Sequence, residues 1–195
     1  MARRKKSLNF VSRGGDKLAG AINAFGLAIS GMTAVDLGAN VGGFSDFLLQ
    51  NGAKRVYAVD TSYGVLDWRL RNDTRVIAMD RTNALHIEIP EPVDLVVVDV
   101  GWTPLGKIVP KALSLVHSEG NVVALLKPQY EAEESERKKG VVLAEYFERV
   151  VSRSIEGLKS EGIKIEGSVM SEVPGSGGNQ ELFLWIRKFP SKDLG

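Results

Sequence analysis

The feature that most constrains the fold is an alternation of short apolar runs, rich in β-branched residues, with segments of helical periodicity. We expect strands at residues 32–37, 55–59, 75–79, 95–100, 122–126, 163–170 and 182–186. We expect helices at residues 16–25, 43–50, 104–116 and 142–159. Several strand runs are continuously apolar, which is typical of parallel strands covered by helices on both faces. The alternation therefore predicts an α/β fold with a doubly wound, mostly parallel sheet.

The basic charge of the chain is concentrated at its beginning. A length of 195 residues fits one domain, and we expect a basic tail at residues 1–10 followed by a domain at residues 11–190. The formal net charge is +1, yet the first 20 residues contain six basic residues and one acidic residue. Such an arm suits contacts to phosphates, and a solubilising tail is the alternative explanation.

The composition excludes several classes of protein. No apolar run approaches the roughly 20 residues that span a bilayer, and no apolar segment of a signal peptide follows the basic start. The chain contains no cysteine, so disulfides, thiolate metal sites and thiol nucleophiles are excluded. We therefore expect a cytoplasmic protein with neither a membrane segment nor a metal site.

Carboxylates stand at the ends of three of the first four predicted strands. They are Asp60, Asp80 and Asp99, and the first strand carries Asp36. In an open α/β sheet, ligands bind at the carboxyl ends of the strands. Asp60 is placed to accept hydrogen bonds from ribose hydroxyls, and Asp80 from an adenine amine. Each aspartate alone could instead form a turn or cap a helix, but the set predicts a nucleoside site.

The turn after the first strand has the pattern D-x-G-x-x-x-G, not the dinucleotide pattern G-x-G-x-x-G. Gly38 and Gly42 allow a tight turn and a close approach of a ligand to the backbone. A pyrophosphate would need additional glycine. The loop therefore fits a nucleoside with an amino-acid tail.

Lys127 closes a very apolar run and is followed by Pro128, which ends the strand. A lysine in this position needs a partner, and Asp99 at the end of the neighbouring strand can supply it. Such a pair could hold a hydroxyl group and, when partly desolvated, assist removal of its proton. A surface ion pair that caps two strands is the alternative. Composition and spacing alone do not assign Lys17 or Glu181 to catalysis.

Seven stretches of the sequence together resemble the FtsJ-like ribosomal RNA 2′-O-methyltransferases, and most closely their TlyA/hemolysin-like branch. They are residues 11–18 (VSRGGDKL), 36–44 (DLGANVGGF), 56–60 (VYAVD), 81–84 (RTNA), 94–100 (DLVVVDV), 126–132 (LKPQYEA) and 178–181 (GNQE). They occur in order and at family-like spacing. The resemblance implies a Rossmann-like class I methyltransferase with a seven-stranded sheet.

The resemblance also implies a cofactor, a substrate and a set of site residues. The family uses S-adenosyl-L-methionine and a Lys-Asp-Lys-Glu tetrad to methylate a ribose 2′-hydroxyl, and the implied tetrad is Lys17, Asp99, Lys127 and Glu181. Lys127 would position and activate the hydroxyl, and the other three would tune it. The implied cofactor-binding residues are Asp36, Gly38, Asn40, Gly42, Phe44, Asp60, Asp80, Arg81 and Asp99. The expected partner is RNA, as ribosomal RNA or a ribosomal subunit, with phosphate contacts from Arg3, Arg4, Lys5, Lys6 and Arg13.

Two features depart from the family pattern. TlyA-type proteins usually carry an N-terminal S4-like RNA-binding domain, whereas about ten residues precede the first matching stretch here. We expect the tail or a partner protein to replace that domain. Residues 101–105 read GWTPL where the family has a run resembling Ser-Phe-Ile-Ser, and Trp102 could stack a flipped base or pack against the wall of the site.

Three other functions compete with RNA methylation. A non-catalytic RNA-binding or ribosome-assembly factor could keep the fold without turnover, although an intact tetrad argues against it. A hemolysin-like membrane-active protein would need a long apolar or amphipathic segment, which the sequence lacks. A nicotinamide-dependent oxidoreductase is disfavoured by the glycine spacing.

Overall fold

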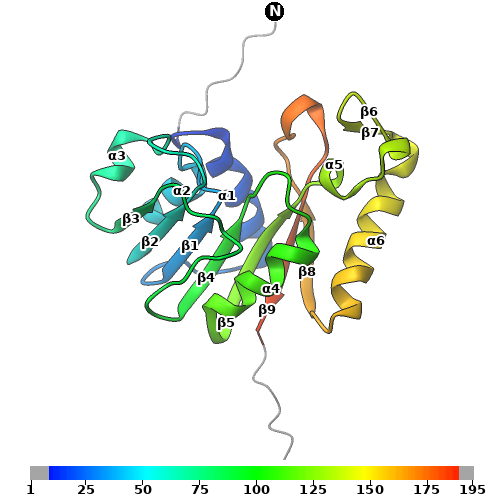
Figure 1. Cartoon of the computed structure of the whole chain (residues 1–195). Helices are drawn as coiled ribbons and strands as arrows, with labels where there is room; N and C mark the ends of the chain where they lie inside the picture. Colours follow the sequence, from blue (N-terminus) through cyan, green and yellow to red (C-terminus); the bar gives the residue numbers. More distant parts are fainter. Residues whose placement is uncertain (1–8, 189–195) are drawn as a thin grey trace, which may run out of the picture.

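Seven strands form the central sheet of the computed structural model, which describes residues 9–188 of the chain (Figure 1). In spatial order they are β3 (Val76–Met79), β2 (Arg55–Val59), β1 (Thr33–Leu37), β4 (Val93–Val98), β5 (Val116–Leu126), β9 (Leu182–Arg187) and β8 (Ile165–Met170). Neighbouring pairs from β3 to β5 are parallel, and β9 is antiparallel to both of its neighbours. The predicted mostly parallel, seven-stranded sheet is confirmed.

The direction in which strands are added to the sheet changes after β3. From β1 it runs outward through β2 to β3 and then crosses back, so that β4 pairs with the other side of β1. Ligands in open α/β sheets bind outside the carboxyl ends of the strands at such a switch in strand order. The topology therefore places a site at the ends of β1 and β4.

Helices cover both faces of the sheet (Figure 1). Helices α1 (Arg13–Phe25) and α2 (Gly43–Gln50) contribute to one buried apolar cluster, and α4 (Leu105–Leu115) and α6 (Phe147–Ser160) contribute to the other. Along β1, Ala34 belongs to the first cluster and Val35 to the second. Successive side chains of a strand point to opposite faces, which is why these strands are apolar throughout.

The largest differences from the predicted boundaries are at the starts of two helices and one strand. Helix α1 begins at Arg13, three residues before the predicted start, because the Ser12 side chain caps it by accepting a hydrogen bond from the Gly14 amide. Gly14 therefore belongs to the first turn of α1. The helix predicted at residues 142–159 begins at Phe147, and β5 begins at Val116, six residues earlier than predicted.

The charged segment at residues 131–140, for which no helix or strand is predicted, contains regular structure. It includes a 3₁₀ turn (Glu134–Glu136) and the strand β6 (Arg137–Lys138), which pairs with β7 (Val141–Val142). The other short elements are α3 (Trp68–Arg71), α5 (Pro128–Glu131) and 3₁₀ turns at Ala144–Tyr146 and Ser176–Gly178. Within residues 9–188, no helix combines the length and apolar character needed to cross a membrane.

Candidate active site

A cleft with a volume of about 550 Å³ lies at the carboxyl ends of β1, β2, β4 and β5. The first turn of α1 lines one part of it through Arg13, Gly14 and Lys17, and the segment that follows β4 lines another through Trp102. The volume falls within the range of small-molecule sites. The cleft therefore occupies the position that the strand order indicates.

Asp36 of β1 lines the cleft although it is fully buried. Its Oδ2 accepts hydrogen bonds from the Ser45 amide (2.9 Å) and hydroxyl (2.7 Å), whereas its buried Oδ1 has no partner among the described residues. Burial, with a smaller contribution from the charges of Asp99 and Asp60, raises the pKa of Asp36 to about 7, and the hydrogen bonds from Ser45 oppose this rise. An unpaired buried oxygen is costly, so Oδ1 is suited to a hydrogen-bond donor of a ligand.

The two glycines of the turn after β1 have different roles. At Gly38, with φ of +90°, a Cβ atom would lie 2.7 Å from the backbone oxygen of Asp99, so glycine lets the ends of β1 and β4 approach each other. At Gly42, with φ of +100°, a Cβ atom would overlap the Leu70 side chain. Gly38 lines the cleft and Gly42 does not. Packing against Leu70 therefore accounts for glycine at position 42.

Asp60, directly after β2, is fixed by the backbone on both sides. Its Oδ2 accepts a hydrogen bond from the Asn40 amide (2.9 Å) and its Oδ1 from the Ser62 amide (2.8 Å). All three residues line the cleft. A carboxylate oxygen can accept more than one hydrogen bond, so Asp60 can also bind hydroxyl groups of a ligand.

Asp80 and Arg81 lie outside the lining of the cleft. Both oxygens of Asp80 accept hydrogen bonds from Arg71 at 2.9 Å, and this bonding lowers the pKa of Asp80. The Arg81 guanidinium lies 4.5 Å from the centre of the Tyr63 ring. The Arg81 amide donates a hydrogen bond to the backbone oxygen of Ser62, so Arg81 is linked to the cleft through the main chain.

Two ion pairs stand together at one end of the cleft. Lys127 Nζ lies 2.6 Å from Asp99 Oδ1, and Lys17 Nζ lies 2.5 Å from Glu181 Oε2. All four residues line the cleft. Lys127 also donates a hydrogen bond to the backbone oxygen of Val100 (3.1 Å), which fixes the direction of its side chain.

The environment of Asp99 favours its protonated form more than water does. Burial raises the pKa of Asp99, the positive charges of Lys127 and Lys17 oppose this rise, and the charge of Glu181 adds to it. The four side chains therefore form one electrostatic unit in which the protonation of one member depends on the others.

Two residues that the sequence did not single out hold Glu181 in place. Gln129 donates a hydrogen bond from Nε2 to Glu181 Oε1 (3.4 Å), and both side chains are buried. A Cβ atom at Gly175 would overlap the Glu181 carboxylate. In the sequence, the only sign that Gln129 belongs to the site is its position directly after the Lys127-Pro128 pair. Gly175 has no such sign beyond its place in a glycine-rich loop.

Aromatic and basic residues stand beside the reactive end of the cleft. Trp102 is 85% exposed, has φ of +62° and packs against Tyr130 at a ring distance of 5.0 Å. The centre of the Tyr130 ring in turn lies 5.8 Å from Lys127 Nζ. Arg13 lines the cleft and is exposed. A flat exposed ring next to a lysine is suited to binding a nucleobase.

The predicted site residues fall into three groups. The tetrad, Arg13 and five cofactor-binding residues besides Asp99 line the cleft, namely Lys17, Asp99, Lys127, Glu181, Arg13, Asp36, Gly38, Asn40, Phe44 and Asp60. Gly42, Asp80 and Arg81 do not line it. Arg3, Arg4, Lys5 and Lys6 lie outside the described residues. Across residues 9–188, no group of three or more histidine or acidic side chains is arranged to hold a metal ion.

Comparisons with known proteins agree on one family. Residues 10–188 match the model of the FtsJ-like methyltransferases. The chain is 40% identical over 189 residues to the 16S/23S rRNA (cytidine-2′-O)-methyltransferase TlyA of Mycobacterium tuberculosis, covering 91% of this chain and 68% of the relative. It is 34% identical over 185 residues to Hemolysin A of Brachyspira hyodysenteriae, covering 90% and 76% of the two chains.

Solved structures agree on the fold. A hemolysin-named protein from Streptococcus thermophilus superposes with a TM-score of 0.90 at 35% identity, covering 96% of this chain and 70% of the other. The N-methyltransferase NodS of Bradyrhizobium japonicum, at 17% identity, a TM-score of 0.63 and coverages of 91% and 95%, shares the fold. The chain belongs to the FtsJ-like methyltransferase family.

Proposed function

We propose that this protein transfers a methyl group from S-adenosylmethionine to a ribose 2′-hydroxyl of ribosomal RNA. The observation that carries the proposal is the convergence of Lys17, Asp99, Lys127 and Glu181 at one end of a cleft of cofactor size. TlyA, a relative named for ribosomal RNA cytidine-2′-O-methylation, supports the choice of substrate. Such a substrate places the activity in the cytoplasm.

The residues of the cleft fit S-adenosylmethionine. The unpaired Oδ1 of Asp36 can accept a hydrogen bond from the amino group of the amino-acid part, and Asp60 can accept hydrogen bonds from ribose hydroxyls. Gly38 also lines the cleft, and its lack of a Cβ atom lets the ends of β1 and β4 approach each other there. When bound, the cofactor supplies a sulfonium methyl group as the electrophile.

The tetrad positions the hydroxyl and receives its proton. Lys127 is fixed by Asp99 and by the Val100 carbonyl, so its ammonium group stands ready beside an incoming oxygen. The raised pKa of Asp99 makes the Lys127–Asp99 pair a better proton acceptor than an exposed carboxylate. The proton of the ribose 2′-hydroxyl passes to the Lys127–Asp99 pair as the 2′-oxygen becomes the nucleophile. Most of the rate gain comes from the orientation of the reacting groups.

The mouth of the cleft suits a nucleotide that has left its helix. Trp102 is exposed beside Lys127 and can stack the base, and Arg13 can contact an adjacent phosphate. Stacking on an aromatic ring is tolerant of base identity. The cytidine preference named for TlyA would therefore require further contacts in this protein.

Methyl transfer from labelled S-adenosylmethionine to ribosomal subunits and to deproteinised ribosomal RNA tests the proposal. We expect label that survives as an alkali-resistant dinucleotide, the mark of 2′-O-methylation. Lys127→Ala should lower kcat about 10²- to 10⁴-fold, with cofactor affinity close to that of the wild type. Lys107→Ala, an exposed lysine of α4, is the matched control.

Two results would contradict the proposal in different ways. Full activity of Lys127→Ala would refute the role of the tetrad. RNA binding by the wild-type protein without any methyl transfer would instead favour a non-catalytic RNA-binding or assembly factor.

A further inference from the structure

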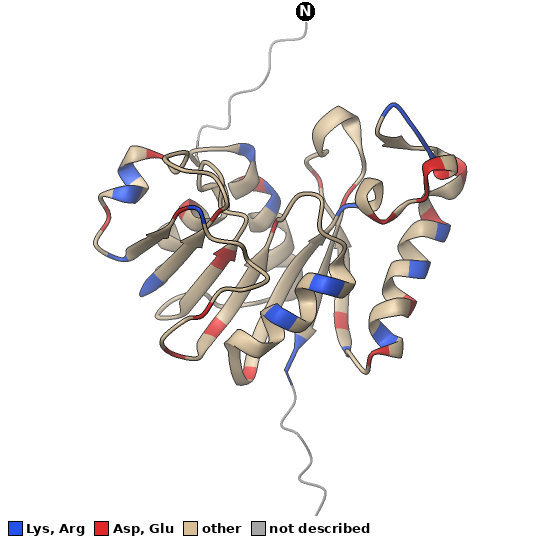
Figure 2. Ribbon diagram, in the orientation of Figure 1, with Lys and Arg blue, Asp and Glu red and all other residues tan. Residues whose placement is uncertain are grey.

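The β6–β7 hairpin presents an exposed basic turn. Arg137, Lys138 and Lys139 are consecutive and exposed. Of these, Lys138 and Lys139 form no ion pair with any residue in the described range 9–188. Figure 2 shows the turn as a continuous basic stretch at the outer edge of the molecule. The function proposed above does not use these three cations.

The turn has a defined geometry although the hairpin is very short. Lys138 pairs with Val141, which leaves Lys139 and Gly140 as a two-residue loop with φ of +52° and +78°. Positive φ at both positions is the signature of a type I′ turn, which matches the twist of the flanking strands. A ladder of two residue pairs is too short to be stable alone, so other parts of the protein must hold it.

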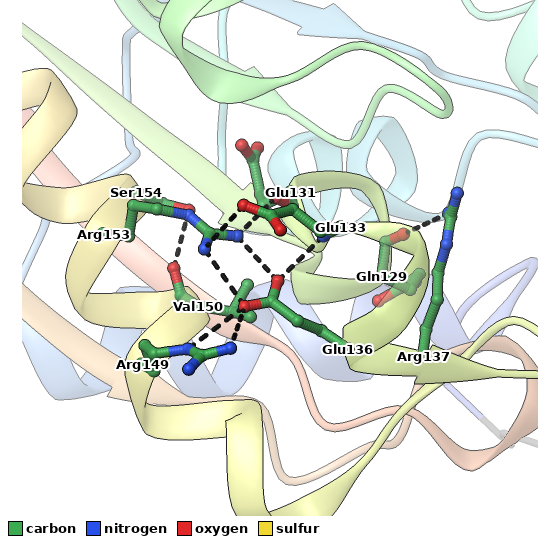
Figure 3. Close-up of polar contacts among 9 residues, drawn as sticks. All are labelled: Gln129, Glu131, Glu133, Glu136, Arg137, Arg149, Val150, Arg153 and Ser154. Carbon is green, nitrogen blue, oxygen red and sulfur yellow. Dashed lines mark hydrogen bonds and ion pairs between the residues drawn. The ribbon is translucent and has the colours of Figure 1, made fainter.

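An ion cluster of the buried Glu136 and two more exposed arginines holds the base of the hairpin (Figure 3). Glu136, immediately before β6, is fully buried and accepts hydrogen bonds at 2.8 Å from Arg149 and from Arg153 of α6. Bonds from Arg153 and from the Glu133 amide lower the pKa of Glu136 to about 2. Arg137 also donates a hydrogen bond to the Gln129 carbonyl (3.1 Å). Glu136 is therefore a charged anchor at neutral pH.

A second anchor ties the turn to the loop that carries Glu181. The Asn179 side chain accepts a hydrogen bond from the Val142 amide (3.2 Å) and donates one to the Gly140 carbonyl (3.0 Å). Asn179 lies two residues before Glu181. In Figure 1 the hairpin and this loop stand side by side at the end of the sheet where β5 finishes. The basic turn is therefore held on the same side of the molecule as the cleft.

We propose that the β6–β7 hairpin is an arm that binds the phosphate backbone of the RNA substrate. An exposed run of charge is usually only solvated, but two anchors, the Glu136 ion cluster and Asn179, fix this one on the same side of the molecule as the cleft. Phosphate contacts are sequence-independent and set the register of a protein on nucleic acid. The identification of the polyanion as RNA rests on the proposed function.

The variant Lys138→Gln/Lys139→Asn removes two cations and keeps the turn. Asparagine tolerates positive φ, and Asn-Gly is the most favoured type I′ sequence. The matched control is Lys54→Gln/Lys159→Gln, which removes two exposed lysines, one just before β2 at the amino end of the sheet and one in the last turn of α6. Both proteins are compared with the wild type in binding deproteinised ribosomal RNA over a series of KCl concentrations.

We expect the hairpin variant to bind RNA roughly three- to tenfold more weakly at moderate salt. The plot of log binding constant against log salt concentration should become less steep by about 1.5, as expected for two lost phosphate contacts. The control should retain the wild-type slope, and kcat at saturating RNA should stay within about twofold in both variants. In the unmodified protein, RNA should protect Lys138 and Lys139 from acetylation, a readout that does not depend on any variant folding.

Several outcomes would overturn the inference. Identical salt slopes for the hairpin variant and the wild type would overturn it. An equal loss of RNA affinity in the hairpin variant and the control, or a failure of RNA to protect the two lysines from acetylation, would also overturn it. If the slope falls but the wild-type protein transfers no methyl group to any RNA, the proposed activity fails and the RNA-binding arm stands. If methyl transfer occurs and the slopes coincide, the arm fails and the activity stands.

Discussion

Lys17 and Glu181 are 164 residues apart in the chain and form an ion pair with 2.5 Å between Nζ and Oε2. Their side chains are 11% and 2% exposed. One comes from the first turn of α1 and the other precedes β9, so the pair joins the two ends of the fold at the cleft. Removing one partner of such a pair leaves an uncompensated charge in a largely buried position.

The first prediction separates the structural and catalytic roles of this pair. Glu181→Leu and Lys17→Met should each lower the free energy of unfolding by about 3 kcal/mol, and the double variant should recover most of that loss because no unpaired charge remains. Methyl transfer should be severely reduced in all three. Chemical denaturation and kcat measure the two effects. A double variant with wild-type activity would show that the pair serves folding alone.

The second prediction concerns the support of Glu181. A methyl group at Gly175 would overlap the Glu181 carboxylate, so Gly175→Ala should displace it and lower kcat about 10- to 100-fold. Cofactor affinity should be unchanged. Gly20→Ala is the control, because an added Cβ there meets no atom within 4 Å. Wild-type kcat in Gly175→Ala would mean that the position of Glu181 is unimportant for the chemistry.

The parts of the site that the sequence predicted are those set by local pattern. Apolar runs located the strands, and the end of a parallel strand fixes where Asp60 and Asp99 must stand. The pairing of Lys127 with Asp99 followed because their strands are neighbours, and the structure has it at 2.6 Å. The contact between Lys17 and Glu181 involves elements far apart in sequence, so only family resemblance could place them together.

Other parts of the fold and site depend on which neighbouring side chains contact one another in three dimensions. A sequence pattern does not show these contacts. Asp80 ends a strand as predicted, yet Arg71 from the preceding helix takes both of its oxygens. Glycine at position 42 suggested ligand approach, whereas its neighbour is Leu70. The β6–β7 hairpin was hidden in a charged segment because its stability comes from Glu136 and α6 and not from apolar alternation.

The third prediction follows from the raised pKa of Asp36. The folded protein holds this proton up to about pH 7, whereas the unfolded chain releases it near the ordinary value of 3.8. Between these values the unfolded state binds fewer protons, so the free energy of unfolding falls as pH rises. Asp36→Asn removes this dependence.

Thermal unfolding from pH 4.5 to 8 measures the effect of Asp36. The Tm of the wild type should fall relative to that of Asp36→Asn by roughly 7–14 °C between pH 4.5 and pH 8. The same substitution should weaken cofactor binding at pH 8, where the wild-type carboxylate is ionised. Parallel Tm curves for the two proteins would contradict the assigned protonation.

The fourth prediction concerns Glu136. Because hydrogen bonds from Arg153 lower the pKa of Glu136 to about 2, its stabilising effect should be complete above pH 4.5 and should disappear as pH falls toward 2. Glu136→Gln should lower Tm at pH 7 by roughly 5 °C, with little difference from the wild type near pH 2. Glu134→Gln, an exposed acid in the same 3₁₀ turn, should behave like the wild type at both pH values. An equal loss in both variants would show that the turn, and not the ion cluster, is responsible.

The fifth prediction concerns the exposed ring of Trp102. If it stacks the target base, Trp102→Ala should lower kcat/KM for RNA about 5- to 100-fold, the range expected for one lost stacking contact. Trp102→Phe should retain most of the activity, because a flat ring remains. Trp68→Ala is the control, because Trp68 is 75% exposed but does not line the cleft. Cofactor affinity should be equal in all of these proteins, since Trp102 is exposed whereas Asp36 is buried at the end of β1. If Trp102 only packs against Tyr130, both alanine variants will match the wild type in kcat/KM, and the base must be held by other residues.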